Sequence, residues 1–311
     1  MPTLYITHTA CLDHLTPLGH PERPDRLKAI ERALEDETFM GLARDTAPMA
    51  TLEAAMLAHP TDYVERIAAA SPEEGLVRID ADTTISPGSL EAARRGVGAA
   101  QMAVDEVMTR KVHNAFCAVR PPGHHAERDR AMGFCLFNNA AIAAYHAKQA
   151  HGAERVAVVD VDVHHGNGTQ DIFWNDPSML YVSTHQMPLY PGTGGIDERG
   201  ADDAGNIVNV PLNPGDGSME FREAMEIVVL PAIDRFQPDL IIVSAGFDAH
   251  TRDPLANIHL VEADFAWATK KLMELADKHA GSRLVSLLEG GYDLMGLALS
   301  TAAHVRALMR V

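Results

Sequence analysis

The stretch Val156-Ala157-Val158-Val159-Asp160-Val161-Asp162-Val163-His164-His165-Gly166-Asn167-Gly168 decides how this chain is interpreted. An apolar run ends in two aspartates and two histidines and then passes into a glycine-rich turn. Successive residues of a strand point to opposite faces, so a strand here would place Asp160, Asp162 and His164 on one face at its end. Two carboxylates and one imidazole in that arrangement are typical of a metal site. The alternative is a buried strand whose polar end is merely solvated or caps a helix, and it explains the cluster less well.

Composition describes a globular chain with a large core. Of 311 residues, 46% are hydrophobic and 22% are charged. Single α/β domains reach this length, and no repeat or linker divides the chain, so we expect residues 1–311 to form one domain. The formal net charge of -17 argues against binding to nucleic acid phosphates. It is compatible with basic substrates and equally with plain solubility.

Cysteine usage and the N-terminus indicate the compartment. The chain has 3 cysteines and no C-x-x-C pair, which argues against a disulfide framework or a zinc knuckle and favours a reducing environment. The N-terminus lacks a basic segment followed by an apolar one, and no apolar run approaches the ~20 residues that cross a bilayer. We therefore expect a cytoplasmic protein that does not enter a membrane; a homo-oligomer remains open.

Strands alternate with helices along the chain. After the opening run, strands are expected at 4–6, 115–119, 179–184, 207–212, 240–243 and 284–288. Helices are expected at 26–34, 51–70 with a break at Pro60, 89–108 capped by Ser89, 140–150, 168–174, 218–235, 261–278 and 294–309, and a loop at 80–84. Several strands are apolar throughout, which is typical of a parallel sheet covered on both faces. The predicted fold class is α/β, with a mostly parallel multi-stranded sheet and helices on both faces.

Chemically useful side chains follow four of these strands. His124 and His125 follow one strand, the opening cluster follows the next, and Asp248 and Tyr292 follow two later strands. Ligands of open α/β sheets bind outside the carboxyl ends of the strands. We therefore expect these side chains to form one site.

The residue types in this site indicate metal-assisted amide hydrolysis. Asp162, His164 and Asp248 would supply three protein ligands and leave a position for water, as in catalytic zinc sites, although Fe²⁺ or Co²⁺ also fits. A metal there would lower the pKa of water and polarise a carbonyl. The tandem histidines suit a general base and acid, and Tyr292 suits a donor to the developing oxyanion.

The chain resembles the zinc-dependent histone deacetylases of the arginase–deacetylase superfamily, nearer their class II branch. The motifs that carry the resemblance follow one another in family order over almost the whole chain. They are His20-Pro21-Glu22-Arg23-Pro24, Pro121-Pro122-Gly123-His124-His125-Ala126, Gly133-Phe134-Cys135, Asp160 to Gly168, Tyr190-Pro191-Gly192-Thr193-Gly194, Ala245-Gly246-Phe247-Asp248-Ala249-His250 and Glu289-Gly290-Gly291-Tyr292.

The resemblance implies the arginase–deacetylase fold and hydrolysis of the amide of N-ε-acetyl-lysine in proteins or peptides, with release of acetate. It implies one zinc ion on the three ligands named above and Tyr292 as the residue that polarises the carbonyl. The resemblance also implies that His125 is the likelier general base and that Asp160 accepts a hydrogen bond from His124. Asn167 stands where class I relatives carry Asp, so the division of labour between the histidines stays open.

The resemblance also implies a tunnel for the acyl-lysine side chain. Phe134 and Tyr190 would form its aromatic walls, although Phe is commoner at the second position, and Gly133 would offer its carbonyl. Leu255 would stand near the mouth. Arg26 is interpreted as a residue that supports the site, although the sequence alone fits a surface charge equally well.

The resemblance further implies a structural potassium ion. The main-chain carbonyls of Asp160, Asp162 and His164 would bind it, with Ser183 and Thr184 nearby. His165 is expected to pack or form hydrogen bonds beneath the site. Other histidines lie singly in predicted helices and are interpreted as ordinary surface or satisfied residues: His59, His113, His146, His151, His279 and His304.

Three other functions compete with lysine deacetylation. Binuclear arginase-like chemistry needs further carboxylates where this chain has Gly166 and His250. Acetylpolyamine hydrolysis is the runner-up, because its enzymes are similar but place an acid at the mouth, where this chain has Leu255. A non-catalytic reader of acetyl-lysine is disfavoured because the tandem histidines and Tyr292 are all present. The substrate is therefore expected to be an acetyl-lysine peptide or protein, or an acetylated small amine.

Overall fold

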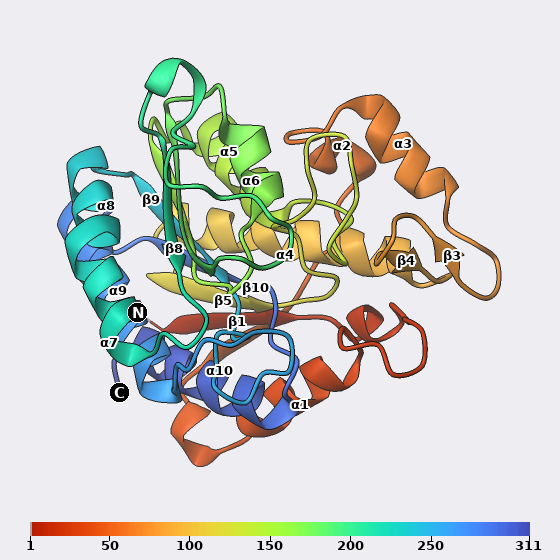
Figure 1. Cartoon of the computed structure of the whole chain (residues 1–311). Helices are drawn as coiled ribbons and strands as arrows, with labels where there is room; N and C mark the ends of the chain where they lie inside the picture. The colour runs from red at the N-terminus through yellow and green to blue at the C-terminus, as the bar shows by residue number, and fades with distance from the viewer. Residues whose placement is uncertain (1) are drawn as a thin grey trace.

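Eight parallel strands form one sheet at the centre of the protein (Figure 1). The structure is a computed structural model and describes residues 2–311. The strands are β1 (Thr3–Thr7), β2 (Ala43–Thr46), β5 (Asn114–Ala118), β6 (Val156–Asp160), β7 (Met179–Gln186), β8 (Ile207–Leu212), β9 (Leu240–Ala245) and β10 (Leu284–Leu288). Their order is β2-β1-β5-β10-β9-β6-β7-β8, and every pairing is parallel.

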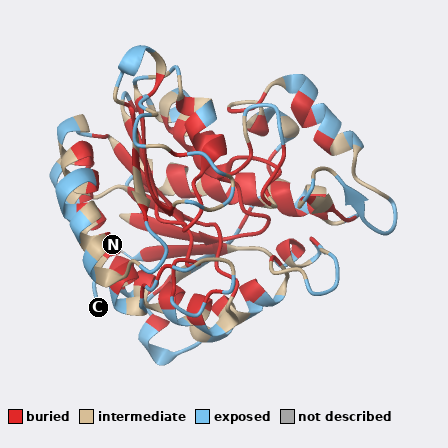
Figure 2. Ribbon diagram, in the orientation of Figure 1, coloured by how far each residue is buried: buried red, intermediate tan, exposed pale blue. Residues whose placement is uncertain are grey.

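Helices cover both faces of this sheet. They are α1 (Asp25–Ala33), α2 (Leu52–Ala55), α3 (Thr61–Ala69), α4 (Ser89–Met108), α5 (Asn139–His151), α6 (Asn167–Phe173), α7 (Ser218–Ala224), α8 (Leu230–Phe236), α9 (Glu262–His279) and α10 (Leu294–Met309). Helices α4 and α5 pack on one face, while α1, α9 and α10 lie on the other (Figure 1). The sheet is buried between these two layers (Figure 2). Among the described residues, no helix is both long enough and apolar enough to cross a membrane.

The strand order brings four distant parts of the chain together. Strands β5, β10, β9 and β6 are consecutive neighbours in the sheet, although β6 precedes β9 by about 80 residues. The register pairs Asp160 with Ser244 and Leu288 with Ala245, so the carboxyl ends of these strands lie level. The side chains that follow these strands therefore meet at one edge of the sheet.

The α/β class with helices on both faces is confirmed, and two short pieces were not anticipated. Strand β2 contributes Ala-Arg-Asp-Thr and is mostly exposed, so it has no apolar pattern to mark it. The segment expected to be a loop at 80–84 reaches into a small antiparallel hairpin, β3 (Val77–Arg78) with β4 (Thr84–Ile85). Such short pairings carry almost no sequence signal.

Two predicted helix details are wrong. Ser89 is the first residue of α4 and Gly88 is its cap, and the Ser89 hydroxyl instead accepts a hydrogen bond from the Ser86 amide at 2.7 Å. The predicted helix at 218–235 is α7 followed by a π-helical turn at Met225–Val229 and then α8. Pro231 lies at the start of α8, where its missing N–H is tolerated.

Candidate active site

Three side chains converge as a metal-binding group at the ends of β6 and β9. His164 Nδ1 lies 3.0 Å from Asp162 Oδ1 and 3.1 Å from Asp248 Oδ2, and one ligand atom from each residue lies within 4.8 Å of the others. All three residues are buried. Burial opposes a proton on His164, but the two carboxylates outweigh it and raise the pKa of His164 to about 10. A divalent cation would neutralise the same surplus of carboxylate charge.

The backbone around this group is shaped to hold the carboxylates. The Gly290 amide donates to Asp162 Oδ2 at 2.8 Å, and the Val163 amide donates to Asp248 Oδ1 at 2.9 Å. A β-carbon at position 290 would lie 2.1 Å from Asp248 Oδ2 and 2.6 Å from Asp162 Oδ2. Position 290 therefore requires glycine if both carboxylates are to keep their places.

The first tandem histidine has a charged partner. His124 Nδ1 donates to Asp160 Oδ2 at 2.9 Å, and the Tyr181 hydroxyl donates to the same oxygen at 3.0 Å. Burial alone would lower the pKa of His124, but Asp160, Asp162 and Glu289 together hold it well above its ordinary value. The environment thus favours the protonated form of His124.

The second tandem histidine has a neutral partner. His125 Nδ1 lies 2.8 Å from Asn167 Oδ1. The Asn167 amide nitrogen donates to Glu127 Oε1 at 2.7 Å, which turns the amide oxygen toward His125. An oxygen acceptor at Nδ1 leaves Nε2 with a free lone pair. Burial and the positive charges of His124 and His164 hold the pKa of His125 well below its ordinary value.

Tyr292 is held at the end of β10 by groups on both sides. Its amide donates to Asp253 Oδ2 at 2.7 Å, and its ring lies 5.0 Å from the guanidinium carbon of Arg26. Arg26 is completely buried and donates from Nε to the Gly291 carbonyl at 2.6 Å and from Nη2 to the Glu289 carbonyl. Arg26 is thus not a surface charge but a buried residue whose hydrogen bonds hold the turn that carries Tyr292.

A cavity of about 220 Å³ opens onto these groups. It is lined by Asp82, His125, Gly133, Phe134, His164, Leu189, Tyr190, Leu255 and Tyr292. The Tyr190 ring stands edge-on to His125 at 5.2 Å, and the Phe134 ring stands edge-on to Tyr292 at 6.0 Å. A β-carbon on Gly133 would lie 2.4 Å from His125, so glycine is needed there for space as well as for its positive φ of 57°.

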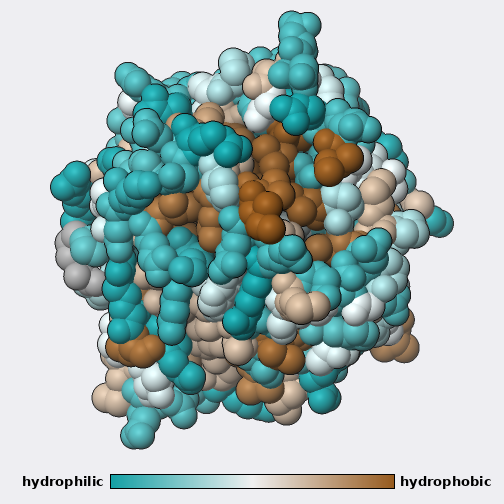
Figure 3. Space-filling model, turned by 60° about the vertical axis from the view of Figure 1, so that its left-hand side comes forward, coloured by the Kyte–Doolittle hydropathy of each residue, from teal (hydrophilic) through white to brown (hydrophobic). Residues whose placement is uncertain are grey.

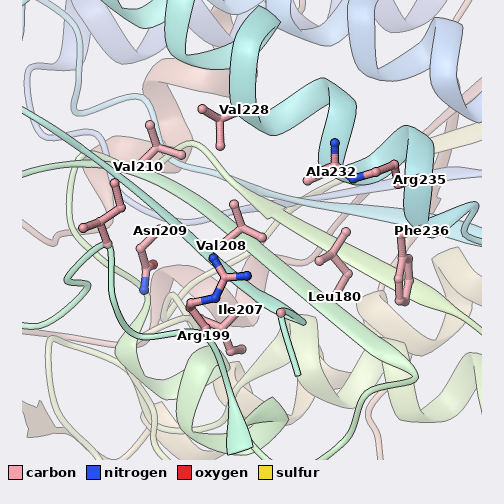
Figure 4. Close-up of a pocket in the computed structure, with 12 residues that line it drawn as sticks. Leu180, Arg199, Ile207, Val208, Asn209, Val210, Val228, Ala232, Arg235 and Phe236 are labelled. Atoms are coloured by element: carbon pink, nitrogen blue, oxygen red, sulfur yellow. The ribbon is translucent and has the colours of Figure 1, made fainter. Parts of the chain in front are cut away.

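A second cavity lies on the side of the molecule that Figure 3 brings forward, where apolar side chains gather in a hollow of a largely polar surface. It measures about 440 Å³ and opens between β8 and α8, with Val208, Val228 and Phe236 among its walls (Figure 4). Its 12 lining residues include two arginines but no histidine, cysteine or carboxylate. This second cavity therefore lacks the groups needed for hydrolysis.

Comparison with known proteins agrees with the geometry. A family model described as the histone deacetylase domain matches residues 20–308. The chain is a member of the histone deacetylase family. A histone deacetylase-like amidohydrolase from Pseudomonas aeruginosa is 43% identical over 278 aligned positions, which cover 88% of this chain and 73% of that protein. A probable deacetylase from Archaeoglobus fulgidus is 38% identical over 314 aligned positions, which cover 99% of this chain and 86% of that protein.

A crystal structure of the HD domain of HDA15 has the same fold. It superimposes with a TM-score of 0.94 and 37% sequence identity, covering 100% of this chain and 90% of that one. Fold and family together place the chain among deacetylases, which are hydrolases that act on acetylated substrates. The expected arginase–deacetylase fold is confirmed.

Gly166 and His250 stand where an arginase-like pair of metals would need further carboxylates. A β-carbon at Gly166 would lie 2.2 Å from Asp160 Oδ2 and 2.6 Å from the Tyr181 hydroxyl, so no carboxylate fits there. His250 faces away from the metal group, because its Nδ1 accepts from the Arg252 amide at 3.1 Å and its Nε2 lies 3.4 Å from Glu262. This arrangement favours one metal ion over an arginase-like pair.

Two residues important for the site were not singled out from the sequence. Glu289 Oε2 accepts from the amides of Gly123 and His124 at 2.7 and 3.1 Å, and so fixes the histidine loop to β10. Asp82 lines the cavity and accepts from the Gly133 amide at 3.0 Å. Glu289 stands inside a quoted motif, but Asp82 lies in a segment whose sequence indicated only a loop.

His165 lies beneath the site and is fully hydrogen-bonded. Its Nδ1 pairs with the Thr193 hydroxyl at 2.8 Å, and its Nε2 with Gln170 Oε1 at 3.0 Å. Ser183 and Thr184 are buried on β7, and Ser183 is the cross-strand neighbour of Asp160. His165 thus braces the loop at 193 and has no ring nitrogen left for a metal.

Proposed function

We propose that this deacetylase hydrolyses the amide of N-ε-acetyl-lysine in proteins or peptides with one zinc ion. The observation that carries the proposal is a pair of adjacent histidines with unlike partners, of which His125 lines the same cavity as His164 and Tyr292. Paired groups whose surroundings push their pKa values apart are suited to act as acid and base.

Asp162, His164 and Asp248 would hold the zinc ion. Two carboxylate oxygens and one imidazole nitrogen suit zinc, and three protein ligands leave a position open. Fe²⁺ or Co²⁺ would also be accepted by these ligands. When bound, the metal supplies Lewis-acid chemistry by lowering the pKa of a water molecule and polarising the substrate carbonyl.

His125 is the proposed general base. Because Asn167 accepts from Nδ1–H, the lone pair of Nε2 is free to take the proton of the attacking water. His124 stays protonated beside Asp160 and stabilises the negative charge that develops on the reacting groups. The proton taken by His125 can then pass to the departing lysine amine.

Tyr292 would donate its hydroxyl proton in a hydrogen bond to the carbonyl oxygen as negative charge develops. Arg26 does not touch the substrate and acts by holding the turn that carries Tyr292. The apolar walls Phe134, Tyr190 and Leu255 suit the methylene chain of lysine, and Gly133 lines the same cavity and would offer its carbonyl there.

A structural potassium ion is a further part of this proposal. The carbonyls of Asp160, Asp162 and His164 would bind it, with Ser183 and Thr184 nearby. The pairing of Asp160 with Ser183 across strands supports this. The thiols of Cys11, Cys117 and Cys135 are free and buried, which suits the reducing environment of the cytoplasm.

The direct test is Tyr292→Phe assayed with a fluorogenic acetyl-lysine peptide at saturating zinc. Removal of one donor to a developing oxyanion lowers kcat by about 100- to 1,000-fold. The phenyl ring keeps the packing against Phe134 and Arg26, so zinc content and thermal stability should match those of the parent. Unchanged activity in the variant would remove Tyr292 from the mechanism.

Acetylpolyamine hydrolysis is a second candidate, and one observation favours it. Asp82 lines the cavity and could hold the distal ammonium of a polyamine, although the apolar Leu255 opposes this at the mouth. The test compares kcat/KM for an acetyl-lysine peptide with acetylputrescine and acetylspermidine, in the parent and in Asp82→Asn. If the parent prefers the acetylpolyamines and Asp82→Asn loses that preference, the substrate is an acetylpolyamine and not acetyl-lysine.

A further inference from the structure

Two histidines interpreted as isolated residues in helices lie together with a carboxylate. His146 and His151 belong to α5, and Asp105 belongs to α4, which packs against α5. The Nε2 atoms of His146 and His151 lie 2.8 and 2.6 Å from the same oxygen, Asp105 Oδ1. Both histidines are hydrogen-bonded, as expected, but they share one carboxylate and lie side by side, which their separate positions in the sequence did not indicate. None of the three takes part in the site described above.

The spacing of these three ligand atoms suits a small divalent cation. They lie within 4.8 Å of one another. Zinc bonds of about 2.0–2.1 Å in tetrahedral geometry place neighbouring ligand atoms about 3.3 Å apart. The two nitrogen–oxygen distances of 2.8 and 2.6 Å need to widen by about 0.5 and 0.7 Å to reach that value, which side-chain rotation of Asp105 can provide.

The surroundings hold the histidines and leave the carboxylate open. The side chains of His146 and His151 are 16% and 18% exposed, whereas that of Asp105 is 49% exposed. The Gln101 amide nitrogen lies 3.3 Å from His146 Nδ1 and donates to it, which orients the ring. When Nε2 binds a metal, Nδ1 carries the proton, and the Gln101 amide turns over so that its oxygen accepts from Nδ1–H. A cavity of about 680 Å³, lined by Gln101, Asp105 and His146, gives an ion access from solvent.

We propose that Asp105, His146 and His151 form a second divalent-metal site, selective for Zn²⁺ or similar transition ions, that joins α4 to the end of α5. Two imidazoles and one carboxylate favour zinc, cobalt, nickel and copper over magnesium and calcium, which prefer oxygen ligands. The three ligands leave at least one position for water. The bound ion replaces two hydrogen bonds by three coordinate bonds between the helices and so stabilises their contact.

The test is the metal content of the intact chain at equilibrium with buffered free Zn²⁺, measured after dialysis by elemental analysis. The parent binds two equivalents of zinc, and His151→Gln and Asp105→Asn each bind one. The matched control is His279→Gln, because His279 pairs with Asp234 at 2.6 Å but has no second histidine beside it. This control retains two equivalents.

Two further readouts separate metal binding from folding and from catalysis. Zn²⁺ above one equivalent raises the melting temperature of the parent and of His279→Gln but not of His151→Gln. Deacetylation by His151→Gln stays at the parent value at one equivalent, which shows that the fold is intact. A parent that binds only one equivalent, or a His151→Gln variant that still binds two, overturns the proposal. In either case the three residues are a hydrogen-bonded link and no metal site.

Discussion

Asn167→Asp tests the proposed division of labour between the tandem histidines. The substitution places a carboxylate where the Asn167 amide oxygen now lies 2.8 Å from His125 Nδ1. His125 has a pKa held below its ordinary value by burial and by the charges of His124 and His164, and it must be neutral to act as a base. A negative neighbour stabilises the imidazolium form, so the pKa of His125 rises. Activity is then lost at a higher pH as the solution is acidified.

The size of the shift follows from the contact distance. Two opposite charges about 4 Å apart attract by about 4 kcal/mol at an effective dielectric constant of 20, which corresponds to about three pKa units. Burial of the new carboxylate and its repulsion by Glu127, which now accepts from the Asn167 amide at 2.7 Å, reduce this effect. We expect the acid limb of the pH profile to move upward by about one to three units.

The assay is kcat/KM for an acetyl-lysine peptide from pH 5 to 10 with metal content measured in parallel. Glu127→Gln alone is the control and leaves the acid limb in place, while the double variant with Asn167→Asp removes the repulsion and shows the larger shift. If the acid limb of the folded, metal-loaded double variant coincides with that of the parent, His125 is not the titrating base.

Three other predictions use separate features. Gly290→Ala lowers the metal content below one equivalent, because its β-carbon would lie 2.1 Å from a carboxylate oxygen of the metal group. The control Gly41→Ala keeps the metal content of the parent, because its β-carbon meets only a methionine carbon at 3.5 Å. Equilibrium dialysis compares the metal content of the two variants. Arg26→Lys loses the guanidinium hydrogen bonds that hold the turn of Tyr292, so kcat falls by about 10- to 100-fold with little change in KM. A rise in KM as large as the fall in kcat would contradict this positioning role. Burial lowers the pKa of His304 to about 3, so its contribution to stability is present above its unfolded pKa of about 6.5 and is lost as the pH falls toward 3. Urea unfolding should show that the difference in the free energy of unfolding between the parent and His304→Gln narrows by about 2 kcal/mol from pH 6.5 to pH 5. A difference in unfolding free energy that stays constant with pH would contradict this prediction.

The alternation of apolar runs with helical periodicity was sufficient to predict the α/β class. β6 is buried along its whole length and is apolar at every residue before Asp160, a pattern typical of a strand in a parallel sheet that is covered on both faces. β2 has no such pattern because it is an exposed edge strand, and a sequence reading cannot separate it from a loop. The strand order could not be predicted from the sequence, because the adjacency of β6 and β9 depends on packing between segments far apart in the chain.

The residues of the site divide in the same way. Asp162, His164 and Asp248 could be recognised because ligand types at strand ends follow a local pattern. Asp82 could not, since its position at the cavity depends on a hydrogen bond to Gly133 about 50 residues away. Arg26 stood open between two interpretations until its burial against the Gly291 carbonyl was known. The shared partner of His146 and His151 could not be predicted, because Asp105 lies on another helix.

The groups proposed for chemistry and those at the rim of the cavity are anchored differently. Asp162, His164 and Asp248 lie two to four residues beyond the ends of β6 and β9 and are buried, whereas Asp82, Tyr190 and Leu255 stand on connecting segments after β3, β7 and β9 and are half-buried or exposed. Connecting segments on the surface accept substitution and insertion more readily than buried strands. Substrate preference in this protein can therefore be re-engineered by exchanging rim segments while the reacting groups stay fixed.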